Sequence, residues 1–276
     1  MDDLVSTQWL AANIGEPDLV IVDSSLFMPG SGRDAHAEFI AGHIPGARFL
    51  DIEALSDEAQ PIPHMLPSAE QFGEAMEQLG VGRGDRLVVY DNSPLRTAAR
   101  GWFMLRHFGA DRAAILDGGL QKWLAEGRPV ESGEPAPRTV RFEASERTGE
   151  VVAKAEVLAG AGHLLDARGA ARFEGHEPDP RPGVAAGHIP GSRSLPFASL
   201  YRDDGTFRDR DEIARLFAAA GADPRAPFVA SCGSGVTANS LIFAAHLLGN
   251  RETKLYDGSW SEWGADPSTP KASGPA

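Results

Sequence analysis

The chain has 276 residues, enough for two domains of ordinary size, and its 42% hydrophobic and 24% charged residues indicate a globular protein without the compositional bias of disorder. Its formal net charge of -13 argues against a general attraction to nucleic acid or to an anionic membrane surface. The single cysteine, Cys232, excludes an intrachain disulfide and a metal site built from several thiolates, and we expect neither a metal nor an organic cofactor.

The N-terminus lacks the basic and apolar regions that mark a secretory signal. No later stretch approaches the roughly 18 consecutive apolar residues that a membrane-spanning helix needs. We therefore expect a cytoplasmic protein with no membrane and no nucleic-acid partner.

One short segment occurs twice in the sequence. Residues 41–48 read Ala-Gly-His-Ile-Pro-Gly-Ala-Arg, and residues 186–193 repeat them almost unchanged. Shorter matches precede and follow this segment in the same order, at 22–23 and 165–166 and at 116–118 and 256–258. Between the copies, residues 131–138 are rich in proline, glycine and charge, as linkers are. We therefore expect a first domain over residues 1–135, a linker over 136–149 and a second domain over 150–276.

The first copy alternates short apolar runs with helical patterns. Its predicted strands cover residues 19–23, 87–91 and 113–117. Ser68 and Gln71 form a capping-box pattern at the start of a predicted helix, and Gly80 ends that helix. A further helix is predicted over residues 97–108, directly after a strand and a short loop.

The second copy repeats this rhythm, with strands predicted over residues 164–166, 228–231 and 254–256 and a helix over 237–248. Such alternation is typical of α/β proteins with buried parallel strands. We therefore predict two tandem α/β domains, each a mainly parallel sheet flanked by helices. Residues 271–276 are small and polar, and we expect them to be disordered.

The loop at residues 232–237 carries the chemistry of the second copy. Cys232 follows a predicted strand directly, and ligands bind at the carboxyl ends of strands in open α/β sheets. Gly233 and Gly235 let the backbone fold around the sulfur, so that its N–H groups and the following helix stabilise a thiolate. The alternative is that Cys232 is a small buried apolar residue. A strand, a glycine-rich loop and a helix that converge on the only cysteine favour the nucleophile.

The equivalent loop of the first copy begins with Asp91 and has no cysteine, so we expect the first domain to be non-catalytic. A cysteine loop also occurs in thiol phosphatases, which hold the phosphoryl oxygens with an arginine six residues after the cysteine. Here that position is Ala238, and the loop has no basic residue. Phosphatase activity is therefore disfavoured.

With its repeated Gly-His-Ile-Pro-Gly, an Asp in the first loop and a Cys in the second, the chain resembles the tandem rhodanese-like sulfurtransferases over nearly its whole length. The loop Cys-Gly-Ser-Gly-Val-Thr is similar to the 3-mercaptopyruvate branch of that family, whereas thiosulfate sulfurtransferases usually carry basic residues after the cysteine. Residues 64–67 and 257–263 also resemble their counterparts in that branch.

The resemblance implies two arginines that hold the substrate carboxylate and keto oxygen, here Arg172 and Arg181. Chemistry supports this assignment, because the planar fork of arginine matches a carboxylate in a bidentate way. Without the resemblance, both would be interpreted as solvated surface arginines. The loop residues expected to contact substrate are Gly233, Gly235, Val236 and Thr237.

The family is also proposed to use a serine, a histidine and an acid as a relay near the cysteine. The resemblance places these roles on Ser234, His64 and Glu53. The family commonly has Asp-Ile-Asp where this chain has Asp-Ile-Glu, so whether the longer Glu53 side chain serves His64 is left open.

The resemblance thus implies that Cys232 takes sulfur from 3-mercaptopyruvate, releases pyruvate and becomes a persulfide. A thiol acceptor, such as a thioredoxin-like protein, or cyanide then collects the sulfur. Two alternatives remain: a thiosulfate sulfurtransferase of the same fold, and a non-catalytic rhodanese-like module that carries sulfur or binds a partner. The ratio of activities on 3-mercaptopyruvate and thiosulfate distinguishes the main hypothesis from the first alternative. Formation of a persulfide on Cys232 distinguishes it from the second.

Overall fold

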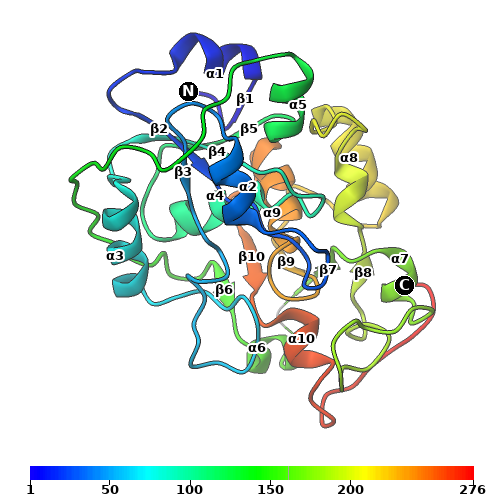
Figure 1. Ribbon diagram of the computed structural model, residues 1–276. Coiled ribbons are helices and arrows are strands. Elements are labelled where there is room, and N and C mark those ends of the chain that lie inside the picture. Colours follow the sequence, from blue (N-terminus) through cyan, green and yellow to red (C-terminus); the bar gives the residue numbers. More distant parts are fainter. Residues whose placement is uncertain (161) are drawn as a thin grey trace. The chain divides into compact units, whose positions relative to one another are not determined.

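The computed structural model describes residues 1–160 and 162–276, which divide into two compact units (Figure 1). Each copy of the repeat contributes one short segment to the unit that the other copy mainly forms. His64 therefore belongs to the second unit, although it lies in the first half of the sequence. The first unit contains Met1–Ser56, Leu66–Arg147 and Arg202–Phe207, and the second contains Asp57–Met65, Thr148–Tyr201 and Arg208–Ala276.

The first unit has a five-stranded, all-parallel sheet with the strand order β1-β5-β4-β2-β3. Its strands are β1 (Leu4–Val5), β2 (Leu19–Asp23), β3 (Arg48–Phe49), β4 (Arg86–Tyr90) and β5 (Ala113–Leu116). Its helices are α1 (Thr7–Asn13), α2 (Ala35–Ala41), α3 (Ala69–Leu79), α4 (Ala98–His107) and α5 (Gly119–Ala125).

The second unit repeats this topology strand for strand, with the order β6-β10-β9-β7-β8 and all pairs parallel. Its strands are β6 (Val151–Val152), β7 (Leu164–Asp166), β8 (Arg193–Ser194), β9 (Phe228–Ser231) and β10 (Thr253–Tyr256). Its helices are α6 (Lys154–Leu158), α7 (Ala170–Phe173), the 3₁₀ helix η1 (Phe197–Leu200), α8 (Arg210–Ala219), α9 (Ala238–Leu247) and α10 (Ser259–Trp263). The predicted fold class is confirmed.

The central strands are apolar on both faces, and helices pack against them. Helix α4 packs on β4 and β5, and α9 packs in the same way on β9 and β10. Both helices are buried over most of their length, so neither has the single apolar stripe of a surface helix. The strand β4 ends at Tyr90, one residue before the predicted end, which leaves Asp91 at the start of the following loop.

Helix α3 begins and ends where the sequence predicts. The Ser68 hydroxyl accepts the Gln71 N–H, and the Gln71 side chain accepts the Ser68 N–H, which completes the capping box. Gly80 follows in the left-handed conformation, with a φ of +71°. This geometry ends the helix because glycine adopts it without a steric penalty.

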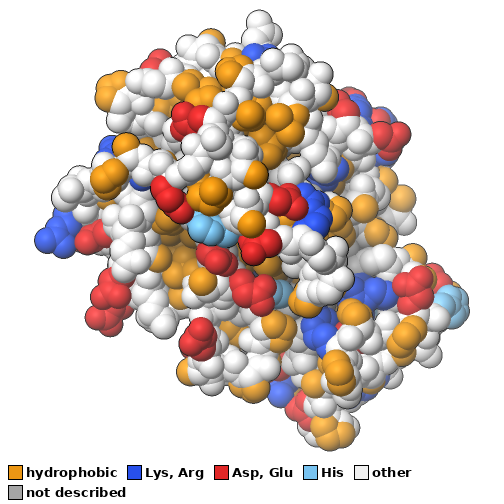
Figure 2. Space-filling model, in the orientation of Figure 1, with side chains coloured by type: hydrophobic (Ala, Val, Ile, Leu, Met, Phe, Trp, Pro, Cys, Tyr) orange, Lys and Arg blue, Asp and Glu red, His pale blue; other side chains and the backbone are white. Residues whose placement is uncertain are grey.

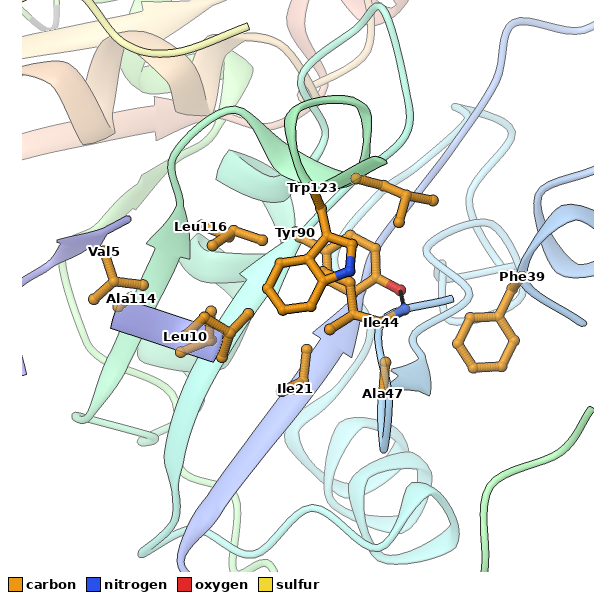
Figure 3. Close-up of a cluster of buried hydrophobic side chains, with 12 residues drawn as sticks. Val5, Leu10, Ile21, Phe39, Ile44, Ala47, Tyr90, Ala114, Leu116 and Trp123 are labelled. Atoms are coloured by element: carbon orange, nitrogen blue, oxygen red, sulfur yellow. Dashed lines mark hydrogen bonds between the residues drawn. The ribbon is translucent and has the colours of Figure 1, made fainter. Parts of the chain in front are cut away.

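Each unit has its own apolar core. In the first unit Trp123, Tyr90 and Leu116 lie together above the sheet, with Leu10 of α1 and Ile21 of β2 beside them (Figure 3). In the second unit the core includes Val229 of β9, Tyr256 of β10 and two tryptophans of α10. Helix α10, which directly follows β10, is thus fixed to its sheet by large aromatic side chains.

The segment predicted as a linker is bound to the first unit. Arg138 forms an ion pair with Asp85 and donates to the Gly80 carbonyl at 3.1 Å. Phe142 is buried and packs edge-on against Phe72. The ion pair and the aromatic contact hold this proline-rich stretch against helix α3 and its C-terminal turn.

The prediction that residues 271–276 are disordered is wrong. Ala272 and His188 exchange two backbone hydrogen bonds, at 2.8 and 2.9 Å. The Gly274 N–H donates to the Glu174 carbonyl at 2.8 Å. These small residues are ordered through their backbone groups, which composition does not reveal.

Charged side chains are scattered over the face shown in Figure 2. Acidic side chains, red in Figure 2, occupy many places on the face shown, among apolar and uncharged atoms. Within residues 1–160 and 162–276, no helix combines the length and the apolar character needed to cross a bilayer.

Candidate active site

Cys232 is the first residue after β9, and its loop leads directly into α9. The cysteine is buried, with 2% of its surface exposed. Gly235 in the same loop has a φ of +74°, and a Cβ atom there would lie 2.5 Å from the carbonyl oxygen of Asp257. Only glycine fits this position, because a side chain would meet both an unfavourable backbone conformation and a fixed oxygen.

The start of helix α10 braces the cysteine loop. The Cys232 N–H donates to Ser259 Oγ at 3.0 Å, and the Trp260 N–H donates to the Cys232 carbonyl at 3.0 Å. Ser261 donates to the Gly233 carbonyl from its N–H at 2.8 Å and from its Oγ at 2.6 Å. These bonds fix the first two residues of the loop. Sequence analysis assigned no role to the two serines.

Ser259 adopts the left-handed conformation, with a φ of +48°, which is uncommon for a residue with a side chain. Its Oγ donates to the Tyr256 carbonyl at 2.7 Å and lies 4.0 Å from Cys232 Sγ. The corresponding residue of the first unit is Gly119, with a φ of +57°. A serine where the other repeat uses glycine is the signal that could have identified this position.

Two of the predicted catalytic side chains meet in the second unit. His64 Nδ1 lies 2.8 Å from Ser234 Oγ, although the residues are 170 positions apart. His64 has a φ of +64°, another left-handed residue with a side chain. The hydroxyl of Ser234 lies two residues after Cys232, so the imidazole is held next to the loop that carries the thiol.

Glu53, the third predicted member of the relay, belongs to the first unit. It lies in a turn that follows β3, where Asp51 Oδ1 accepts hydrogen bonds from the Glu53 and Ala54 N–H groups, each at 3.0 Å. Its predicted partnership with His64 stays a prediction.

The two predicted substrate arginines lie together at the cysteine loop. Arg172 is on the short helix α7, and Arg181 follows in the next loop. A Cβ atom on Gly233 would lie 3.1 Å from Nη2 of Arg181 and 3.6 Å from Nη2 of Arg172. The arginine side chains are 24% and 26% exposed, so neither is a freely solvated surface residue.

The second half of the loop is held by the helix that follows it. Val236 is buried, and Thr237 is the N-cap of α9 without a capping side-chain bond. Asn239 Nδ2 donates to the Gly235 carbonyl at 2.6 Å and to the Val236 carbonyl at 2.9 Å. These two hydrogen bonds from Asn239 fix the backbone of the second half of the loop. Sequence analysis did not identify Asn239.

A family profile described as "Rhodanese-like domain" matches residues 6–126 and again residues 151–266. The two matches fall on the two copies of the repeat. The chain belongs to the rhodanese family. The resemblance inferred from the sequence is thereby confirmed.

Several curated proteins are similar to this chain over nearly its whole length. The 3-mercaptopyruvate sulfurtransferase of Escherichia coli is 42% identical over 271 residues, which cover 96% of each chain. The human 3-mercaptopyruvate sulfurtransferase is 41% identical, over 94% of this chain and 91% of its own. The crystal structure of SseA from Escherichia coli superposes with a TM-score of 0.86 at 40% identity, covering 95% of this chain and all of that one.

The first rhodanese-like unit has a carboxylate where the second has its thiol. Asp91 accepts hydrogen bonds from the N–H groups of Ser93 at 2.8 Å and of Ala98 at 2.7 Å. Burial raises the pKa of Asp91, and these two N–H groups partly oppose the increase. The chain therefore has a thiol at the start of one loop and a hydrogen-bonded carboxyl group at the start of the other.

Proposed function

We propose that this chain transfers sulfur from 3-mercaptopyruvate to a thiol or to cyanide through a persulfide on Cys232. The observation that carries the proposal is the pair Arg172 and Arg181 beside Gly233, the residue next to the only cysteine. A 2-keto acid needs cationic donors for its carboxylate, and this pair supplies them without a basic residue in the loop itself.

Binding would place the substrate carboxylate and keto oxygen on the two guanidinium groups. The Nε of Arg172 is buried and has no hydrogen-bond partner among the residues that the structure describes. A bound carboxylate would supply an acceptor for such a donor and remove the cost of leaving it unpaired. The substrate sulfur would then face the loop that begins at Cys232.

In the first chemical step, the Cys232 thiolate attacks the sulfur of 3-mercaptopyruvate. An S–S bond forms, the C–S bond breaks, and its electron pair remains on the carbon as the enolate of pyruvate. The outer sulfur keeps the hydrogen of the substrate thiol, and the enolate takes up one proton through the Ser234–His64 pair to give pyruvate. The N–H groups of Gly233, Gly235, Val236 and Thr237 are the donors we assign to the developing negative charge.

We assign the transfer of the enolate's proton to the pair Ser234 and His64, whose side chains are 2.8 Å apart. In this scheme Ser234 contacts the reacting atoms and His64 exchanges a proton with it. We assign Glu53 to the same relay, as an acid that orients His64.

Turnover requires an external acceptor. A second thiolate or cyanide attacks the outer sulfur of the persulfide, and Cys232 leaves as the thiolate. We propose a thioredoxin-like protein as one such acceptor, since the chain has no second cysteine to act internally. The cytoplasm, where thiols are kept reduced, is the compartment we propose for this reaction.

The domain assignment follows the same division of roles. We propose a non-catalytic first domain over residues 1–135, a catalytic second domain over 150–276 and, between them, a linker over 136–149 that packs on the first unit. The support is the placement of Asp91 in the first loop and Cys232 in the second.

The test compares initial rates with 3-mercaptopyruvate and with thiosulfate at matched concentrations, with Cys232→Ser as the blank. We expect a strong preference for 3-mercaptopyruvate and at least a thousandfold loss of pyruvate release in the variant. Mass spectrometry after donor treatment should show one added sulfur atom on Cys232. Preference for thiosulfate would favour the alternative donor, and absence of the added sulfur would favour a binding module.

A further inference from the structure

Asp179 lies between the two substrate arginines and contacts both. Its Oδ2 accepts a hydrogen bond from Nη2 of Arg172 at 2.6 Å. Its Oδ1 accepts bonds from Nη1 of Arg181 at 3.1 Å and from the Arg181 N–H at 3.0 Å. The Asp179 side chain is almost completely buried, with 1% of its surface exposed.

The Asp179 carboxylate offsets the repulsion between the two arginines and restricts their side chains. Two guanidinium groups repel each other, and each sits on a flexible side chain with many rotamers. A buried carboxylate is costly unless it is paired and hydrogen-bonded, and Asp179 is paired with both arginines. The arrangement therefore holds Arg172 and Arg181 at a fixed separation beside Gly233 before any substrate arrives.

The same carboxylate sets the charge of the site. Arg172, Arg181 and Asp179 together have a formal charge of +1 instead of the +2 of the arginines alone. A single positive charge matches a monoanion such as the carboxylate of 3-mercaptopyruvate. A dianion such as thiosulfate would leave one negative charge unbalanced in a partly buried site.

We propose that Asp179 is a positioning and specificity-determining residue, which fixes the arginine pair as one fork and tunes it for monoanionic donors. This inference rests on the proposed function, because it assigns the pair to substrate binding. Asp179 acts through the arginines and takes no part in bond making or bond breaking.

The test measures KM and kcat for 3-mercaptopyruvate and thiosulfate in Asp179→Asn and Asp179→Glu. In Asp179→Asn the fork loosens and its charge rises by one. We expect the KM for 3-mercaptopyruvate to rise about tenfold with kcat within about threefold of wild type. The preference for 3-mercaptopyruvate over thiosulfate, as a ratio of kcat/KM values, should fall at least tenfold.

Asp179→Glu keeps the charge and moves the carboxylate by one methylene. Its KM for 3-mercaptopyruvate should rise, while the balance between the two donors stays closer to wild type than in Asp179→Asn. If Asp179→Asn fails to fold, the KM of Asp179→Glu for 3-mercaptopyruvate tests the proposal by itself. A KM equal to that of wild type would overturn it.

The matched control is Asp85→Asn, since Asp85 is also a buried carboxylate that pairs with an arginine, Arg138, but lies in the first unit. Its donor preference should equal that of wild type. An Asp179→Asn protein with wild-type KM and donor preference would overturn the role of Asp179. A wild-type protein that releases no pyruvate from 3-mercaptopyruvate would instead overturn the proposed function.

Discussion

The loops that follow β4 and β9 occupy the same place in two sheets of identical strand order. In the first unit the loop folds around the carboxylate of Asp91, which accepts two N–H groups, one of them at the start of helix α4. In the second unit the loop begins with the thiol of Cys232. The comparison shows that this loop can present its N–H groups to an anion. In the second unit the group in this place would be the thiolate or persulfide that we propose on Cys232, whereas in the first it is the carboxyl group of Asp91.

A second difference lies at the ends of β2 and β7. In the second unit Asp166 pairs with Arg168, with Nη2 to Oδ2 at 2.6 Å and Nε to Oδ2 at 3.0 Å. In the first unit Ser25 stands in place of the arginine, and Asp23 accepts the Ser25 N–H at 2.9 Å. Burial raises the pKa of Asp23 to about 6. The same acid therefore forms an ion pair with an arginine two residues later in one repeat, whereas a serine holds that position in the other.

The largest expected effect comes from breaking the ion pair of the second unit. Asp166→Asn keeps the shape of the side chain but leaves the buried Arg168 without its counter-charge. We expect a loss of about 3 kcal/mol in stability, since removing one partner of a buried pair strands the other. Thermal unfolding at neutral pH should occur at a lower temperature, with faster hydrogen exchange in the amides of β7. Unchanged exchange there would mean that Arg168 finds another acceptor.

The same substitution in the first unit should have the opposite sign. The pKa of Asp23 is about 6 in the folded chain and 3.8 as a reference, so between these values the folded state binds more protons than the unfolded state. Stability therefore falls as the pH rises from about 4 to about 6. Asp23→Asn cannot ionise, and above pH 6 it should be more stable than wild type by up to about 3 kcal/mol.

Hydrogen exchange of the β2 and β4 amides as a function of pH measures this effect within the first unit. Wild type should lose protection between about pH 4 and pH 6, and Asp23→Asn should not. The two proteins should be equally protected below pH 4. A variant that is less protected than wild type at pH 7 would show that ionised Asp23 is stabilised by its neighbours.

Much of this molecule could be predicted from the sequence, because the relevant signals are local or repeated. The parallel strands follow from short apolar runs, and the capping box at Ser68 marks the start of α3. The unusual loop at Cys232 is recognisable because the other repeat provides a comparison. The resemblance to the family rested on this loop, on its counterpart at Asp91 and on the repeated Gly-His-Ile-Pro-Gly segment.

What could not be predicted depends on contacts between distant segments. Nothing near His64 in the sequence indicates that it belongs to the second unit, and only the family resemblance placed it in a relay with Ser234. Asp179 lies between the two predicted arginines, but only the fold shows that it contacts both. The order of residues 271–276 arises from backbone pairing with His188, which a polar, small-residue composition conceals.

The smallest expected effect would make the second unit resemble the first at position 259. Ser259→Gly keeps the left-handed backbone but removes the Oγ that accepts the Cys232 N–H. Relief of backbone strain and loss of the hydrogen bonds oppose each other, so stability should change by less than about 1 kcal/mol. The loop would hold Cys232 less firmly, and we expect kcat/KM to fall about tenfold, which corresponds to about 1.4 kcal/mol. Ser259→Ala loses the same hydroxyl but retains the strain, so it should be less stable than Ser259→Gly with a similar loss of rate. Equal activity of wild type and Ser259→Gly would mean that Trp260 and Ser261 suffice to fix the loop.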